Sequence, residues 1–464
     1  MESPPDDILV LIADCLEDHD DRYNAIFVNR QFHATFSGSL YRSVTLNNRS
    51  QIQSFTKTLI LHPHLIPVVH SLAIEDRRHG SEKPTLTHDD LAMFSLQASQ
   101  ISQSAGEHLQ WEQDLCLGKG EAWTALLLSI VTNLRFLKLR CHTFSQYLET
   151  LFTRATTQQK PFDTRPAFHR LEELSLALVD GKDEEKQSFS NSQIRPFLRL
   201  LRLQRLSIDS FVEYLPPSDQ GDNDDSDSND DPSKPSISPI SDLILTSSNA
   251  PDGTSTLLTS CPSLKTFKYQ HSDDHAPATT GFQPRAFSQT LSPHKSTLET
   301  LHLDNFGTHH AFTASGLNES CDDRFGSLAD FTALRELRIR VRNLLDVPYT
   351  LEPTVSLAEV LPVQIESLFI EDCRENLFGM LVRQLAGLLE ARFGALRRID
   401  VEGFFHVDDE DLDASGVDGS AGRCARVIKP AVYDAVQTVE EACAEAGIQF
   451  VLRDRMCVQT LSEG

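Results

Sequence analysis

The 464-residue chain lacks several features that would place it in a secreted, membrane-spanning or metal-binding class. Its nine cysteines include no C-x-x-C pair, which argues against a zinc module or a disulfide framework. The longest apolar run, at 125–131, is far too short to cross a bilayer, and the acidic N-terminus has no apolar stretch typical of a secretory signal. We therefore expect reduced thiols and a soluble protein of the cytoplasm or nucleus.

Basic residues are also scarce, with 42 Lys and Arg against 67 Asp and Glu and a formal net charge of -25. This argues against nonspecific binding to nucleic acid. There is no G-x-S-x-G, P-loop, G-x-G-x-x-G or H-E-x-x-H motif. Histidines at 271–275 and 309–310 stand among turn residues without further ligands at fixed spacing. We expect no catalytic site, metal, cofactor, nucleic-acid partner or membrane partner.

One acidic segment, residues 216–242, differs in composition from the rest of the chain. It carries eight Asp against one Lys, together with many Ser and Pro. Such a composition cannot bury enough apolar surface to offset the entropy of ordering, so we predict a disordered insert. A calcium loop starting at Asp222 is disfavoured, because the sixth position is not Gly and the twelfth is Ser233 rather than Glu.

An internal repeat of the form L-x-x-L-x-L, with other apolar residues allowed, occupies most of the chain. Its nine copies start at Val69, Leu134, Leu171, Leu203, Leu264, Leu298, Leu334, Ile365 and Leu396. From Leu264 onward the copies start 31 to 36 residues apart. The two wide gaps, of 65 residues after Val69 and 61 after Leu203, would each hold a degenerate repeat or an insertion.

The last part of each copy has period two and predicts a strand, whereas residues 121–134, 144–155, 193–203 and 377–393 have helical periodicity. A strand and a return helix in each unit of about 30 residues predict an α/β solenoid. A last helix at 430–447 and a strand at 448–454 would close it. The alternative is an ordinary α/β domain with similar strands.

These repeats resemble leucine-rich repeats from Pro67 to Asp454. The Asn or Cys that the family places three residues after the last apolar strand residue is matched only by Cys373. Phe211, Phe404, His142 and Arg342 stand at this position in other copies. The resemblance therefore implies an irregular version with longer repeats and no continuous asparagine ladder.

The N-terminal 46 residues have a different pattern. Ser3 and Pro4 are suited to begin a helix, and apolar residues follow at helical spacing from Ile8 to Leu16. A second helical segment runs from Tyr23 to Val28, and a third contains Phe32 and Phe36 before Gly38. The segment at 41–46 is β-branched and predicts a strand. Three short helices cannot form a large core, so apolar surface should remain for a partner.

This segment resembles an F-box, a resemblance carried by Pro5, Asp7, Ile8, Leu9, Ile12, Leu16, Val28, Arg30, Phe32, Leu40, Tyr41, Arg42, Val44 and Leu46. It implies an F-box at 1–46 followed by a leucine-rich-repeat-like solenoid at 47–455. It also implies docking on a Skp-type adaptor and a cullin scaffold in an SCF ubiquitin ligase. The adaptor-binding residues would be Pro5, Ile8, Leu9, Ile12, Leu16, Val28, Arg30 and Phe32, although some of the apolar ones could form the core of the module.

The residues between the strand leucines should line the open face of the sheet, where a protein substrate would bind. From them we predict substrate contacts at Lys138, Arg140, Lys268, His302, Arg338, Arg340, Phe369 and Arg398. Arg338 and Arg340 form the densest basic cluster, which suggests an acidic or phosphorylated peptide as ligand. The alternative is that these are solvated strand residues without a ligand.

The sequence thus favours a noncatalytic substrate-recognition subunit of an SCF-type ligase. An interaction scaffold without ubiquitin transfer remains an alternative. A leucine-rich-repeat GTPase-activating protein is disfavoured, because such proteins have shorter, more regular repeats and no F-box in front.

Overall fold

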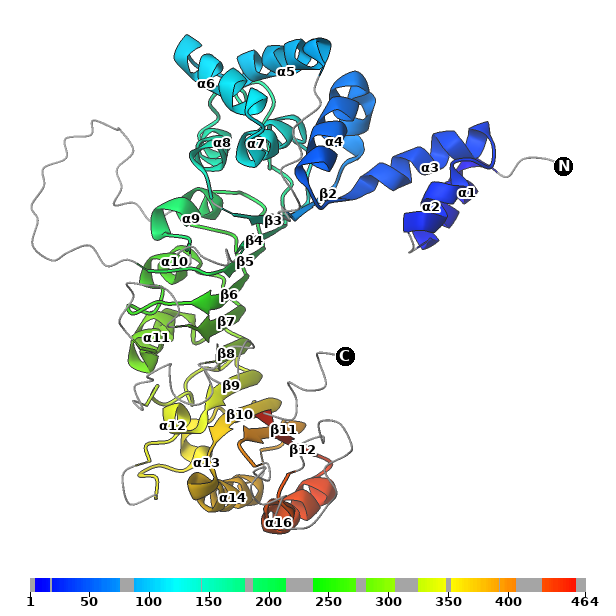
Figure 1. Ribbon diagram of the computed structural model, residues 1–464. Helices are drawn as coiled ribbons and strands as arrows, with labels where there is room; N and C mark the ends of the chain where they lie inside the picture. The colour runs from blue at the N-terminus through cyan, green and yellow to red at the C-terminus, as the bar shows by residue number, and fades with distance from the viewer. Residues whose placement is uncertain are drawn as a thin grey trace, which may run out of the picture. The chain divides into compact units, whose positions relative to one another are not determined.

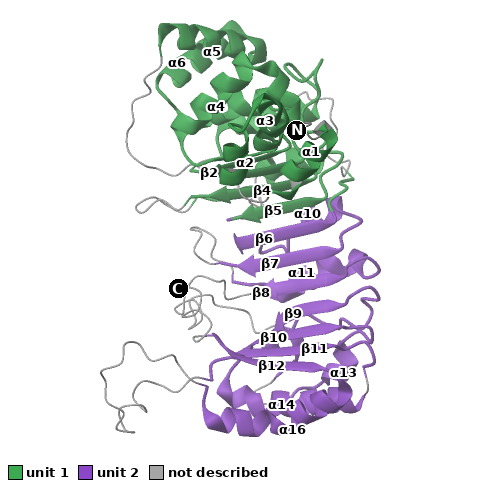
Figure 2. Ribbon diagram, turned by 90° about the vertical axis from the view of Figure 1, so that its right-hand side faces the viewer, with its two compact units in different colours: residues 1–209, 236–240 green, residues 210–235, 241–464 purple. Residues whose placement is uncertain are grey.

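The computed structural model describes residues 5–16, 19–75, 87–142, 144–179, 187–213, 237–272, 281–304, 324–347, 352–391, 393–405 and 428–455 (Figure 1). The chain divides into two compact units (Figure 2). Unit 1 comprises Met1–Asp209 and Ser236–Ile240, and unit 2 comprises Ser210–Pro235 and Ser241–Gly464. Each unit is described by itself below. The predicted domain boundary after residue 46 stays a prediction.

The N-terminal module, residues 5–46, contains three helices and a strand, as the sequence predicts, but their bounds differ: the second helix ends before Phe27 and Val28, and the third continues through Gly38 to Arg42. They are α1 (Asp6–Cys15), α2 (His19–Ala25), α3 (Arg30–Arg42) and β1 (Ser43–Leu46). Asn29 caps α3, since its side-chain oxygen accepts a hydrogen bond from the Phe32 amide at 2.8 Å. Helix α3 runs directly into β1 without a linker, and the His70 amide donates to the Arg42 carbonyl at 2.9 Å. The module is therefore connected to the rest of unit 1 directly, without a linker segment.

The remaining part of unit 1 alternates strands with helices. Its elements are α4 (Arg49–Leu61), the 3-10 helix η1 (Pro63–Val68), β2 (Ser71–Glu75), α5 (His88–Ile101), α6 (Ala105–Cys116), α7 (Gly120–Ile130), β3 (Phe136–Cys141), α8 (Gln146–Thr156), β4 (Glu173–Leu178), α9 (Asn191–Leu198) and β5 (Arg205–Asp209). Strands β1 to β5 pair in parallel and in chain order. Parallel neighbours need a crossover, and in Figure 1 helices α7, α8 and α9 lie on one side of these strands.

Unit 2 also consists of parallel strands joined by crossovers. Its elements are β6 (Asp242–Ser248), α10 (Ser255–Ser260), β7 (Thr266–His271), α11 (Pro284–Leu291), the 3-10 helix η2 (Ser292–His294), β8 (Thr300–Asp304), β9 (Glu336–Arg340), α12 (Val341–Leu344), α13 (Leu357–Val360), β10 (Ser367–Cys373), α14 (Glu375–Glu390), β11 (Arg398–Gly403), α16 (Pro430–Ala446) and β12 (Gln449–Asp454). Strands β6 to β12 also pair in parallel in chain order.

The repeat pattern sets the register of the strands. All nine predicted copies form strands, β2 to β5 in unit 1 and β7 to β11 in unit 2. Apolar residues of equivalent position stand opposite each other, for example Leu137 with Leu174 and Leu301 with Leu337, and all four are almost fully buried. Each strand therefore directs its apolar residues toward the helices and its intervening residues to the open face.

The prediction of a disordered insert at 216–242 is wrong for its last residues. Residues 237–242 are described, Ile240 is fully buried, and Asp242 begins strand β6. Ile240, Leu243 and Leu245 form a further copy of the repeat, which the adjacent Asp-rich composition hides in the sequence. The second wide gap therefore holds an extra repeat. Residues 216–236 lie outside the described part of the chain.

The first wide gap holds a helical insertion. Helices α5 and α6 stand between β2 and α7, and the ring of Phe94 packs edge-on against Trp123 with their centroids 4.6 Å apart. Both aromatic side chains are buried. This attaches α5 firmly to the crossover helix α7.

Candidate interaction surfaces

The core of the N-terminal module decides which apolar residues remain available to a partner. Leu9 and Ala13 of α1 and Phe36 of α3 are almost fully buried together, and Leu16 and Phe32 pack against them. The predicted contact of Leu9 with a partner is therefore wrong in this structure, because Leu9 fills the space between α1 and α3. Leu16 and Phe32 are half-buried and contribute mainly to the same core.

A second stripe of α1 faces solvent. Ile8 and Ile12 are exposed by 46% and 42%, and Val10 and Leu11 beside them are also exposed. In the turn between α2 and α3, Phe27 and Val28 are exposed by 67% and 63%. Large apolar side chains at this density on a small module indicate a protein-binding surface. Two further members of the predicted adaptor-binding set, Pro5 at the start of the module and the charged Arg30, are exposed as well.

On the open face of unit 1, only two of the predicted substrate residues are present. Lys138 and Arg140 of β3 are exposed. The Lys138 ammonium lies 3.0 Å from a Glu75 carboxylate oxygen on β2. In register, Lys138 stands between Ala73 and Ser175, and Arg140 stands between Glu75 and Ala177. This face therefore carries charged residues of both signs, together with the exposed ring of Phe136.

The open face of unit 2 is different. The register places Lys268, His302, Arg338, Phe369 and Asp400 side by side on five successive strands, β7 to β11. We call this line of residues the central row. It brings together four of the predicted substrate residues, which are 34, 36 and 31 residues apart in sequence between neighbours.

Arg338 is the centre of this row. Its Nε donates to Glu371 Oε2 at 2.9 Å and its Nη2 to Asp304 Oδ2 at 3.1 Å, while its guanidinium carbon lies 4.5 Å from the centroid of the Phe369 ring. Burial, together with the nearby Asp304, raises the pKa of Glu371 to about 8. The positive charge of Arg338 opposes this shift.

A second ion cluster lies on the other side of Phe369. Asp400 accepts hydrogen bonds from Arg398 and from Arg453 of β12, the latter at 2.9 and 3.1 Å. Burial raises the pKa of Asp400, but these two arginines outweigh it and hold the pKa below its usual value. The Arg453 guanidinium also lies 5.9 Å from the Phe369 centroid. Phe369 is thus flanked by arginines from strands on both sides of β10.

The prediction that Arg340 contacts a ligand is wrong. Arg340 is only 2% exposed, and its guanidinium binds Asp372 through Nε at 3.0 Å and through Nη2. Arg340 is the last residue of β9 and still pairs in register with Glu371, which is also buried. Asp372 has a φ of 54° at an irregularity in the pairing of β10 with β11, which turns its carboxylate toward Arg340.

The remaining two residues of the row, Lys268 and His302, lie on the neighbouring strands β7 and β8. His302 Nε2 lies 2.8 Å from a Glu336 carboxylate oxygen. Burial, and then the positive charge of Lys268, lowers the pKa of His302. His302 is therefore largely neutral at physiological pH.

The surface as a whole is preorganised rather than strongly basic. The arginines predicted to attract an acidic peptide are already bonded to Asp304, Glu371, Asp372 and Asp400. What remains is an aromatic ring whose neighbouring guanidinium groups are held in place, a combination enriched in interface hot spots. Sequence reasoning missed Arg453, although continuing the alternation through 449–454 would have placed it on this face.

The comparisons with known proteins are limited to one part of the chain. Residues 226–395 match the family described as a leucine-rich repeat domain. No curated protein matches the chain significantly. Over this range the chain is similar to leucine-rich repeat domains, in agreement with the parallel strands β6 to β10.

Membrane-spanning helices and metal sites were also considered among the described residues. None of their helices is long and apolar enough to cross a membrane. Within the same residues, no group of three or more His, Cys, Asp or Glu side chains is placed to hold a metal ion.

Proposed function

We propose that this chain is a noncatalytic substrate-recognition subunit of an SCF-type ubiquitin ligase. The N-terminal module would bind a Skp-type adaptor, which connects it to a cullin scaffold. The open face of unit 2 would contact the protein substrate. The observation that carries the proposal is the exposed apolar stripe of Ile8, Leu11 and Ile12, together with Phe27 and Val28, on a module whose residues resemble an F-box.

The connection between α3 and β1 supports the same function. A ligase subunit must hold its substrate at a defined distance from the ubiquitin-carrying enzyme. Helix α3 passes into β1 without an intervening residue, and the bond from the His70 amide to Arg42 ties the joint to the next strand. Such a direct, hydrogen-bonded connection would limit the movement of the module relative to the strands that follow it.

The test is copurification of the full chain with a Skp-type adaptor and a cullin. We expect Ile12→Asp with Phe27→Asp to abolish the complex. Burying each apolar side chain stabilises an interface by about 1.5–3 kcal/mol, so losing both should weaken binding at least about 100-fold. Leu9 is unsuitable for this test, because its replacement would unfold the module.

Leu96→Asp with Leu109→Asp is the matched control. Both leucines are 64% exposed, on α5 and α6 of the same unit, so these substitutions introduce the same charges away from the module. The control should bind the adaptor like the unmodified chain. If the unmodified, folded chain binds no adaptor, the ligase proposal fails and an interaction scaffold without ubiquitin transfer becomes the better interpretation.

The substrate part is tested by Phe369→Ala. We expect this variant to bind the adaptor normally but to lose proteins that are captured by the unmodified chain. Arg340 should not be used for this purpose, since its buried bond to Asp372 makes it a structural residue. An unchanged set of captured proteins would exclude the central row as the substrate surface.

A further inference from the structure

Two arginines of unit 2 share one buried carboxylate on the open face of the strands. Asp400, in β11, is only 2% exposed and accepts hydrogen bonds from Nε and Nη2 of Arg398, which stands two residues earlier in the same strand. It accepts two more from Nε and Nη2 of Arg453 in β12. The guanidinium groups of Arg398 and Arg453, which we call the arginine pair, therefore reach the same carboxylate from two different strands.

The arginine pair carries more positive charge than Asp400 balances. Burial raises the pKa of Asp400, but the two arginines outweigh burial and hold the pKa below its usual value, so Asp400 is ionised at neutral pH. Both guanidinium groups stay protonated throughout the physiological range. One negative charge against two positive charges leaves these three side chains with a net charge of +1.

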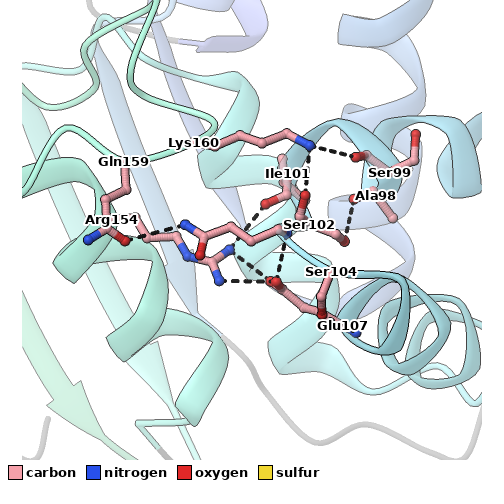
Figure 3. A network of polar contacts seen from close by, with 10 residues as sticks. Ala98, Ser99, Ile101, Ser102, Ser104, Glu107, Arg154, Gln159 and Lys160 are labelled. Atoms are coloured by element: carbon pink, nitrogen blue, oxygen red, sulfur yellow. Dashed lines mark hydrogen bonds and ion pairs between the residues drawn. The ribbon is translucent and has the colours of Figure 1, made fainter.

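A polar network of unit 1 shows the balanced case. There Arg154 of α8 donates two hydrogen bonds to the carboxylate of Glu107, at 2.8 and 3.1 Å, and a third to the carbonyl of Ile101 (Figure 3). One cation stands against one anion, and the Arg154 side chain is only 14% exposed. Such a contact holds helices together. The arginine pair of unit 2 differs both in its charge and in its exposure to solvent.

The arginine pair is accessible, whereas the carboxylate that positions it is not. The side chains of Arg398 and Arg453 are 40% and 35% exposed. A guanidinium group has five N–H donors. Each arginine uses only Nε and Nη2 for Asp400, so neither Nη1 group has a hydrogen-bond partner among the residues that the structure describes. Donors held in a fixed position thus remain free for the oxygens of a ligand.

The nearby carboxylates do not cancel this charge. Glu402, which pairs in register with Arg453, is buried in an ion pair with Arg455, 2.8 Å away. The exposed Glu336 lies two strands from Arg398, because Ser367 stands between them in register. Two strand spacings are about 10 Å, which is about one Debye length at physiological salt. Solvent and salt therefore largely screen Glu336 from the arginine pair.

Apolar side chains flank Asp400 on both neighbouring strands. The register places Phe369 of β10 on one side of Asp400 and Val451 of β12 on the other. Both side chains are half-buried, and the Arg453 guanidinium lies 5.9 Å from the centroid of the Phe369 ring. A ligand could therefore place an apolar group on Phe369 or Val451 while an anionic group contacts the arginine pair. Arginine beside an aromatic ring is also a composition typical of interface hot spots.

We infer that the arginine pair binds an anionic group, a carboxylate or a phosphate, which the substrate protein carries beside an apolar side chain. The anionic oxygens would accept charge-assisted hydrogen bonds from the free N–H groups of Arg398 and Arg453. The apolar neighbour would lie on Phe369 or Val451. The inference rests on the proposed function in one respect, since it calls the ligand a substrate. The binding surface itself does not depend on whether the N-terminal module binds an adaptor.

The acidic or phosphorylated peptide that the sequence suggests would thus bind at different residues. Arg340 is buried in its pair with Asp372, and Arg338 already donates to both Asp304 and Glu371. Neither of these arginines shares a carboxylate with a second exposed guanidinium group in the described chain. The arginine pair does, which makes it the better anion site of this face.

The test is titration of the full chain at pH 7 with four acetylated and amidated pentapeptides, Ala-Leu-X-Leu-Ala, followed by saturation-transfer NMR, which detects weak binding. X is glutamate, phosphoserine, glutamine or lysine. We expect the glutamate and phosphoserine peptides to bind at least about ten-fold more tightly than the glutamine peptide, because hydrogen bonds between charged groups are the stronger ones. The lysine peptide should bind most weakly. Equal affinity of the glutamate and glutamine peptides, or no binding of either anionic peptide, would overturn the inference.

Single variants locate the anion. Arg453→Gln removes one cation but leaves Asp400 bonded to Arg398, so unit 2 should stay folded. We expect this variant to lose the preference for the anionic peptides, and Arg398→Gln to do the same. Arg397→Gln is the matched control, since it removes an equal charge one residue away, where the side chain lines a groove with residues of α14 and α16. A preference that survives in Arg398→Gln and Arg453→Gln would contradict the inference.

Two comparisons complete the experiment. Tighter binding of the phosphoserine peptide would assign the site to a phosphorylated substrate, and tighter binding of the glutamate peptide to an acidic one. Adaptor copurification with the same variants separates this inference from the ligase proposal. Binding of the anionic peptides without binding of the adaptor would contradict the ligase proposal alone, and the reverse result would overturn the inference alone.

Discussion

Units 1 and 2 share one strand pattern but use it differently. The row that holds Lys268, His302 and Arg338 in unit 2 holds Lys138 between the small residues Ala73 and Ser175 in unit 1. Unit 1 instead has its polar networks among helices α5 to α8. The apolar positions of the repeat therefore define the architecture, and the positions between them define where each unit can recognise a ligand.

The largest expected effect breaks the buried ion pair of unit 2. Asp372→Ala leaves the buried Arg340 guanidinium without its carboxylate, and loss of one partner of a buried pair costs about 3–5 kcal/mol. We expect a correspondingly lower free energy of unfolding for unit 2, measured by hydrogen exchange of its strand peptides. Arg383→Ala, which breaks an exposed pair with Glu352, is the control and should change little.

Equivalent core substitutions test whether the buried apolar residues of the repeat contribute equally to the stability of both units. Leu174→Ala in β4 and Leu301→Ala in β8 each remove a fully buried side chain at the same position of the pattern. We expect each to destabilise its own unit by about 2–5 kcal/mol in hydrogen exchange. A loss of stability in only one of the two variants would show that the buried repeat positions of the two units do not contribute equally.

The pH dependence that Glu371 gives to unit 2 should have the opposite sign to the one that Asp114 and Glu107 give to unit 1. Burial raises the pKa of Glu371 to about 8, above its unfolded value, so its contribution to stability is present at low pH and is lost as pH rises toward 8. The slope is at most about 1.4 kcal/mol per pH unit. For Asp114 and Glu107 of unit 1 the pKa is lowered, so their contribution is lost as pH falls below the usual carboxylate range.

Hydrogen exchange of unit 2 between pH 5 and 8 measures this difference. Glu371→Gln should flatten the decline of unit 2 stability over that range without affecting unit 1. A decline that is equally steep in Glu371→Gln would show that another group is responsible.

The smallest expected loss of stability comes from two equivalent surface ion pairs, one in each unit. Arg135 with Glu172 in unit 1 and Arg335 with Glu366 in unit 2 occupy the same position, just before successive strands. Because both are well exposed, Arg135→Ala and Arg335→Ala should each cost less than about 1 kcal/mol. Thermal unfolding in low and high salt measures this. A loss of stability above about 1 kcal/mol in only one of the two variants would show that the ion pair of that unit contributes more than an exposed pair normally does.

Much of the fold was predictable because it depends on local periodicity. The nine repeat copies, the helices at 121–134, 144–155, 193–203 and 377–393, and the last helix and strand all correspond to observed elements. Strand β6 was missed, since the Asp-rich residues before it masked the pattern beginning at Ile240. Helices α4, α5 and α6 were not predicted either, because their identity depends on packing, as between Phe94 and Trp123.

The candidate surfaces were predicted less completely. In α1, Leu9, Ala13 and Leu16 form one stripe at helical spacing and Ile8, Ile12 and Cys15 form another. Periodicity favours neither stripe, and only the position of Phe36 decides that Leu9 is inside and Ile12 outside. Similarly, alternation placed Arg338 and Arg340 on one face, but the irregularity at Asp372 took Arg340 into the interior.

The sequence by itself determined the order of strands and helices, the apolar rows of the sheet and the residues that resemble an F-box, because each depends on neighbours close in the chain. Tertiary structure decided which arginines are neutralised, which stripe of α1 is exposed, and that Arg398 and Arg453 share one carboxylate. These outcomes depend on groups such as Arg338 and Asp304, or Arg453 and Asp400, that are more than 30 residues apart. Their proximity is set by strand register and helix packing, which local pattern does not encode.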